Sequence, residues 1–316
     1  MVSAILLVAF GVTAGNWGAS ALAQARWTAR APRLAIAAWQ ALASSVLLSI
    51  AAAGAALAIG FQHVRGDLAQ LLNLCAENLK HGYASPAGTL LATLGVLTLG
   101  LLVARTGWCA LSTWRQEAGE RRARVAMLDL VGHTNIVPGV LVLEHPSPYA
   151  FCVGGRRRRV VVTRGLLESL GQHELDAVLA HEAAHLRQRH HLALMICRTT
   201  FKTLAPLFPA FRSAMPLVQL LAELCADDCA RRRVGAEPLQ SALLRLARIS
   251  APSGTLAASA SDVETRLLRL GHQKAGLPRH RAFLTGITIV GLAAVPLALV
   301  VAPALAMAWE GMCLIG

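Results

Sequence analysis

The chain has 316 residues and a formal net charge of +13, yet only 15% of its residues are charged and its mean hydropathy is +0.52. Soluble enzymes of this length carry more charge, so the composition excludes an ordinary soluble globular protein. Apolar residues gather at both ends, around an arginine-rich middle, which indicates a membrane protein that holds a polar domain.

Four apolar runs are long enough to cross a bilayer, which takes about 20 helical residues. They are apolar all round, which suits lipid better than the buried core of a soluble protein. Three predicted membrane helices fall in residues 1–109, and the fourth falls in residues 282–316, before a short tail. The runs cover about residues 1–22, 34–61, 87–108 and 283–309.

The basic residues predict the orientation, because cytoplasmic loops collect Lys and Arg. Arginines follow the first run, follow the third and precede the fourth, whereas the charges of residues 62–86 balance and the tail has no base. We therefore expect both termini outside the plasma membrane and a cytoplasmic domain over residues 110–281. The same bias explains the net charge by contact with the anionic lipid bilayer, so no direct nucleic-acid contact is expected.

Seven cysteines are present, and five of them fall on the reducing side, where structural disulfides are not expected. Cys75 and Cys313 both fall outside, and a disulfide between them is a hypothesis. Cys225 and Cys229 lie four apart on a predicted helix. They suit either a metal pair or small buried side chains, and the second interpretation is favoured.

The polar middle predicts a small sheet with helices packed on it, an α+β domain. Residues 136–145 alternate weakly around a Pro-Gly turn signal, and residues 148–165 predict a hairpin with Gly154-Gly155 as a two-residue turn. Residues 192–221 are apolar but interrupted by prolines, so they are either core or graze the bilayer. Helices are expected from about residue 171 and over about 216–233, 238–249 and 262–271.

The stretch AVLAHEAAH, residues 177–185, carries the chemistry. His181 and His185 are four apart, about 40° around a helix, so both rings can hold one Zn²⁺ ion. Glu182 is offset by about 100°, which aims its carboxylate at the open coordination position. There it can take a proton from the attacking water and pass it to the leaving amine.

The third ligand is expected from a second helix, in ELCADD, where Glu223 can reach the open side of the histidine pair. Asp227, one turn later, can accept the spare ring N–H of a zinc histidine. Asp228 is rotated by about 100° from Asp227 and fits less well.

His191 is the alternative third ligand, ten residues after His181. It would serve only if the chain left the helix at Gln188, which is a good helix former. We therefore expect the helix to continue, with His190 and His191 at a solvated or membrane-facing end.

The HExxH motif at His181 and the later ExxxD at Glu223 resemble those of the gluzincin membrane peptidases, the M48 family and the M56 family of BlaR/MecR-like proteins. Three membrane helices, a zinc domain and a fourth helix resemble the M56 layout more closely, over most of the chain. The resemblance implies an α-helical membrane protein with four transmembrane helices and a cytoplasmic α+β gluzincin-like metalloprotease domain. It also implies a zinc endopeptidase that cleaves a regulatory protein, such as a winged-helix transcriptional repressor.

The resemblance extends to two flanking segments. Ala150, Phe151, Cys152 and Val153 resemble the family's edge strand, which implies that they pair with the substrate backbone. DVETRLLRL resembles a downstream segment whose arginine, here Arg266, would pair with an acid near the site. No penicillin-binding domain follows the last helix, so a beta-lactam trigger is not expected. The alternatives are an M48-like quality-control protease for membrane proteins and a non-catalytic signalling scaffold with structural zinc.

Overall fold

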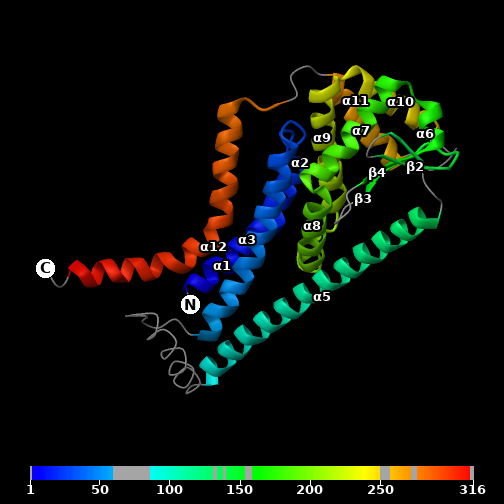
Figure 1. Ribbon diagram of the computed structural model, residues 1–316. Helices are drawn as coiled ribbons and strands as arrows, with labels where there is room; N and C mark the ends of the chain where they lie inside the picture. Colours follow the sequence, from blue (N-terminus) through cyan, green and yellow to red (C-terminus); the bar gives the residue numbers. More distant parts are fainter. Residues whose placement is uncertain are drawn as a thin grey trace.

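The computed structural model describes residues 2–59, 86–130, 134–137, 140–153, 159–249, 257–271 and 276–313. The protein is mostly helical. Long apolar helices form one part, and a smaller part with a four-stranded sheet lies at one end of them (Figure 1).

The four predicted apolar runs are all helical. The first is α1 (Val2–Thr13), the π-helical turn η1 (Ala14–Gly18) and α2 (Ala19–Gln24), and the others are α3 (Pro32–Ile59), α5 (Pro86–Leu130) and α12 (Arg279–Cys313). Each contains a stretch long and apolar enough to span a membrane. Large apolar side chains such as Leu101 and Val290 stand about 70% exposed on them, which suits contact with lipid. Their crossing of the membrane and their orientation stay predictions.

Helix α5 is longer than predicted. The third run was expected to end at residue 108, but the helix continues to Leu130, because its polar extension is rich in the good helix formers Arg, Glu and Ala. In this extension Glu117 pairs with Arg198 of α8 (His190–Leu204) at 2.7 Å. The predicted domain boundary at residue 110 therefore falls inside one continuous helix.

The sheet contains β1 (Thr134–Val137), β2 (Val140–Leu143), β3 (Ala150–Val153) and β4 (Arg159–Thr163). The strand order is β1-β2-β4-β3, with β2 and β4 parallel and the other two pairs antiparallel. Alternate valines of β2 and β4 pack toward α6 (Arg164–Ser169) and α7 (Gln172–Gln188), as the period of two requires. Strand β3 is the outer strand next to α7.

The predicted hairpin is present, but its predicted two-residue turn is wrong. Val153 pairs with Arg159, so residues 154–158 connect the strands, and they lie outside the described residues. A turn at Gly154-Gly155 would have paired Val153 with Arg156 and put four arginines into β4. The observed register instead places the β-branched Val160–Val162 opposite β3, which avoids burying those charges.

The remaining helices are α9 (Ala214–Val234), α10 (Glu237–Ile249) and α11 (Ala257–Gly271), close to the predicted ranges, although α11 begins five residues earlier than expected. Gly235 ends α9 with a φ of +93°, a conformation that glycine adopts without steric cost.

Residues 192–221 contribute buried side chains to the core, although Ile196 and Leu207 are exposed, and contact of this segment with the bilayer stays a prediction. They fold as α8, the short η2 (Pro209–Phe211) and the start of α9, and they pack on α3 of the apolar part. Trp39 of α3 meets the rings of Phe201 and Phe211 edge-on, with centroids 5.7 and 6.2 Å away, and all three side chains are buried. The polar domain is thus joined to the apolar helices by a shared hydrophobic cluster.

Candidate metal centre

The start of α7 is held in place by one carboxylate. Glu174 accepts a hydrogen bond from the backbone N–H of Gly171 at 2.9 Å, which satisfies a free donor at the helix start. The same carboxylate contacts Ser241 and Arg245 of α10. Further along α7, Ala177, Ala180 and Ala184 are buried, so neighbouring helices can approach the backbone closely.

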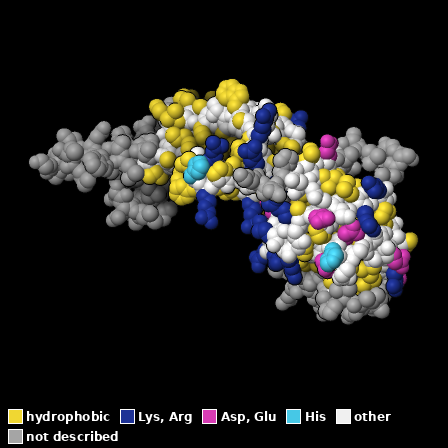
Figure 2. All heavy atoms as spheres, turned by 90° about the horizontal axis from the view of Figure 1, so that it is seen from above, with side chains coloured by type: hydrophobic (Ala, Val, Ile, Leu, Met, Phe, Trp, Pro, Cys, Tyr) yellow, Lys and Arg dark blue, Asp and Glu magenta, His cyan; other side chains and the backbone are white. Residues whose placement is uncertain are grey.

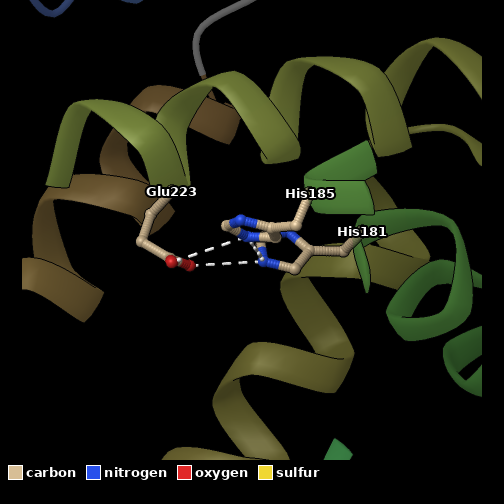
Figure 3. Close-up of side chains that lie close together, drawn as sticks. All are labelled: His181, His185 and Glu223. Carbon is tan, nitrogen blue, oxygen red and sulfur yellow. Dashed lines mark hydrogen bonds and ion pairs between the residues drawn. The ribbon is translucent and has the colours of Figure 1, made fainter. Parts of the chain in front are cut away.

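Three side chains from two helices converge beyond this start. His181 and His185 project from α7, and the carboxylate of Glu223 points at their ring nitrogens from α9 (Figure 3). The two Nε2 atoms lie 3.2 Å apart. Oε2 of Glu223 lies 3.2 Å from Nε2 of His181, and Oε1 lies 3.5 Å from Nε2 of His185.

These separations fit a tetrahedral metal ion. Zinc bonds of about 2.0–2.1 Å place two tetrahedral ligands about 3.3 Å apart. The three measured separations, from 3.2 to 3.5 Å, lie close to that value. Two imidazoles and a carboxylate are also a donor set that zinc accepts, and a catalytic zinc site uses three protein ligands. The residues present therefore fit a zinc ion with one open coordination position.

Asp227 and Arg266 support the first histidine from behind. Oδ1 of Asp227 lies 2.9 Å from Nδ1 of His181, although this contact is poorly aligned for a hydrogen bond. Arg266 of α11 donates two hydrogen bonds of 2.8 Å to Asp227, and its Nη1 lies 3.3 Å from Glu223. Asp227 is fully buried, so the arginine compensates a charge that would otherwise be costly.

The ionisable groups of the site shift one another's pKa values. Burial lowers the pKa of His181, but the carboxylates of Asp227 and Glu223 outweigh burial and raise this pKa to about 9. Burial raises the pKa of Glu223, and its contact with His181 outweighs burial and lowers this pKa to about 2. Burial lowers the pKa of His185 to about 4. The raised pKa of His181 thus favours a proton on its ring in the metal-free protein at neutral pH.

Glu182 lies on the side of α7 that faces the outer strand. Burial raises the pKa of its carboxyl group, and the thiol of Cys152 on β3 acts in the opposite direction as a hydrogen-bond partner. Beside it, a cavity of about 190 Å³ reaches from Cys152 and Val153 to His185. Glu117 and Arg121 of α5 form its far wall. Of the four strand residues singled out in the sequence, Cys152 and Val153 therefore line this cavity, and the role of Ala150 and Phe151 stays a prediction.

The expectation of a continuous helix past Gln188 is wrong. Arg189 adopts a left-handed conformation with a φ of 52°, ends α7 and starts α8. The change of direction brings His190 back, so that its Nδ1 lies 2.9 Å from Nδ1 of His185. His190 is 5% exposed, not solvated as predicted, and it holds His185 as Asp227 holds His181. Nothing in the type of residue 189 signals this break.

Several other predicted candidates do not belong to the metal-binding group, although His191 lines the cavity beside His185. Among the described residues, the group suited to a metal contains neither His191 nor Asp228. The carboxylate of Asp228 is instead paired with Arg269 at 2.8 Å. Of the cysteine pair interpreted as small buried side chains, Cys225 is buried and Cys229 is only partly buried. The proposed disulfide of Cys75 falls outside the described residues.

Part of the chain is similar to known proteins. Residues 111–220 match the family described as Peptidase family M48. A Protease HtpX homolog of Listeria monocytogenes is 47% identical over 53 residues, which is 16% of this chain and 17% of that protein. Protease HtpX of Nitrosococcus oceani is 33% identical over 92 residues, 28% of this chain and 29% of that protein. No solved structure matches.

These similarities support a membrane metallopeptidase of the M48 type. They do not confirm the predicted M56, BlaR/MecR-like identification. The chain spans less than a third of the length of the relatives named here. The matched range contains the HExxH motif of α7 but ends before Glu223, so the third ligand is assigned from geometry.

Proposed function

We propose that the protein is an integral membrane zinc endopeptidase. The convergence of His181, His185 and Glu223 at tetrahedral separations, with Glu182 beside them, carries the proposal. Three protein ligands leave one position open, whereas a structural zinc site takes four. This geometry favours an enzyme over a scaffold with structural zinc.

Zinc, when bound, supplies a Lewis acid that polarises the scissile carbonyl and lowers the pKa of the attacking water. Glu182 accepts the proton of that water and later returns it to the leaving amine. Its partly buried position favours such a shuttle, because burial raises its pKa. Asp227 and His190 orient the two histidines through their Nδ1 atoms.

The substrate is a polypeptide that lies along β3 in extended form. In the described part of the sheet β3 pairs on one side only, with β4, so its other edge is open to a further strand. The cavity beside His185 continues from this strand and can take a side chain. Glu182 contacts β3 through Cys152, so a backbone bound along this strand would lie next to the proposed proton acceptor.

The similarity to proteases named HtpX supports the M48-like alternative, membrane-protein quality control, as the biological role. The arginines that flank the apolar runs support a site on the cytoplasmic side. The predicted cleavage of a winged-helix repressor finds no support in these similarities, because it rested on the M56 layout.

The Glu182→Gln substitution tests the proposal. In detergent, the variant should cleave casein about 10²–10⁴-fold more slowly than the wild type, because the proton acceptor is lost. Its zinc content should be unchanged, since this side chain is not a ligand. The matched control is Glu168→Gln, an exposed acid on α6, which should keep full activity. Equal casein cleavage by Glu182→Gln and wild type would contradict the assigned role.

A further inference from the structure

A cluster of arginines lies outside the metal centre, where the first turn of α3 meets the last turns of α7 and α9. It lines an open surface depression of about 690 Å³, and a second depression of about 210 Å³ shares Arg33 and Arg232 with the first. Among the described residues, the wall of the first depression contains no acidic side chain. Its lining consists of Arg33, Arg187, Gln188, Cys229, Arg232 and Arg233.

Two of these guanidinium groups converge on one weak acceptor. Nη2 of Arg232 lies 3.0 Å from Sγ of Cys229, and Nη2 of Arg33 lies 3.8 Å from the same sulfur. A thiol accepts hydrogen bonds poorly, so it does not compensate two neighbouring positive charges. Phosphate oxygens could accept from both guanidinium groups at once, which is the geometry that arginine suits best.

The acid that borders the cluster, Asp228, is already paired. Asp228 belongs to the wall of the smaller depression, but Arg269 donates to both of its carboxylate oxygens at 2.8 Å. The positive charge of the cluster therefore remains available to a ligand.

The position of Arg33 also points to an anion. Arginines at the ends of α7 and α9 have a sufficient structural explanation, since positive charge stabilises a helix C-terminus. Arg33, however, lies in the first turn of α3, where the helix dipole disfavours a positive charge. Pro32 has no backbone N–H and that of Ala35 donates to the carbonyl of Ala31, so in the first turn of α3 the N–H groups of Arg33 and Leu34 are the donors that could add to an anion site.

The pocket lies at the end of a candidate membrane span, which begins at Pro32. On the face drawn in Figure 2, Lys and Arg side chains gather along the border between the apolar helices and the polar domain. We propose that the pocket around Arg33 and Arg232 binds the phosphate of an anionic lipid headgroup at the membrane surface.

The pocket is linked to the metal centre through Gln188. Nε of Arg33 donates to Oε1 of Gln188 at 3.0 Å, and Nε2 of His190 lies 3.3 Å from the same oxygen. His190 in turn contacts the ring of His185. A headgroup bound to Arg33 would therefore be connected to His185 through consecutive contacts with Gln188 and His190.

Lipid binding by the full chain in detergent micelles tests the proposal without any need for proteolysis. Native mass spectrometry would measure the affinity for phosphatidylglycerol, phosphatidylcholine and inorganic phosphate. We expect preference for phosphatidylglycerol, and an affinity about tenfold lower in Arg33→Gln/Arg232→Gln, since both guanidinium groups of the pocket would donate to the same phosphate. The double variant Arg279→Gln/Arg281→Gln is the control, because it removes the same charge from exposed positions at the start of α12.

The control should keep its affinity for phosphatidylglycerol within about twofold. Equal losses in the two double variants would overturn the pocket, because surface charge alone would then explain binding. Inorganic phosphate that binds as tightly as the lipid would overturn the lipid assignment. If the first double variant melts early, Arg187→Gln replaces it, since this side chain is exposed and can be removed without loss of packing.

Discussion

At the residue scale, the two acids at the end of ELCADD have different partners, although they are neighbours in sequence. Asp227 is buried against His181 and Arg266, whereas Asp228 pairs with Arg269. The helical offset of about 100° between successive residues separates them. The preference for Asp227 over Asp228 in the sequence rested on this offset.

Asp227→Asn should lower zinc affinity about 10–100-fold, because a neutral amide orients His181 less well and leaves Glu223 as the remaining acidic partner of Arg266 among the described residues. Competition with a chromophoric chelator measures the affinity. The adjacent Asp228→Asn is the matched control, and it should keep zinc affinity within about twofold because its carboxylate serves Arg269. Similar zinc losses in both variants would show that general destabilisation, not support of His181, is responsible.

Zinc affinity should also depend on pH through His181. The pKa of His181 is raised to about 9, so the metal must displace a proton at neutral pH. Affinity should therefore rise about tenfold per pH unit between pH 7 and 9 and level off above. The metal-free protein should show the opposite trend. A raised pKa stabilises the fold fully below about pH 6.5, and this stability is lost as the pH rises through 9.

Chelator competition at several pH values, with thermal melts of the metal-free protein, measures both trends. The carboxylate of Asp227 is a main cause of the raised pKa of His181. In Asp227→Asn this pKa should therefore be lower, and zinc affinity should depend less on pH between pH 7 and 9. If the zinc affinity of the wild type did not change between pH 7 and 9, a proton on His181 in the metal-free protein would be excluded.

At the element scale, α3 and α5 cross at a pair of glycines. A Cβ on Gly95 would lie 2.5 Å from the carbonyl oxygen of Gly54 and from the backbone nitrogen of Ala58. Small residues at such a crossing let two apolar helices pack backbone to backbone. The sequence contains several glycines in these helices. The packing of α3 against α5 shows which of them contact the neighbouring helix.

Gly95→Leu should force these helices apart and lower the melting temperature in detergent, because the added side chain meets backbone that cannot yield. Gly100→Leu on the same helix is the matched control, since nothing lies within 4 Å of a Cβ there. Its melting temperature should stay near that of the wild type. Two variants of equal stability would show that α3 and α5 do not cross at this point.

At the scale of the whole molecule, the polar domain is not independent of the apolar helices. Trp39, Leu42 and Val46 of α3 belong to the same buried cluster as Phe201 and Phe211. Helix α9, which carries Glu223, also packs on α3. The shape of the metal centre therefore depends on the membrane part.

A fragment of residues 110–281, the predicted domain, should fail to fold as a soluble monomer. It would expose Phe201, Phe208 and Phe211, which are at most 6% exposed in the full chain. Size-exclusion chromatography and thermal melts, with the detergent-solubilised full chain as the reference, measure this. A monomeric fragment with a cooperative melt would instead support an autonomous domain.

The sequence by itself determined the apolar runs, the HExxH helix and the acidic partner helix. These features follow from local periodicity, since residues four apart share one face of a helix whatever surrounds it. The tertiary structure alone decided the turn of His190 toward His185, the register that keeps Arg156 out of β4, and the arginine pocket around Arg33. In each case the cause is non-local, because a left-handed Arg189, a strand partner and a meeting of three helix ends depend on packing between segments far apart in the chain.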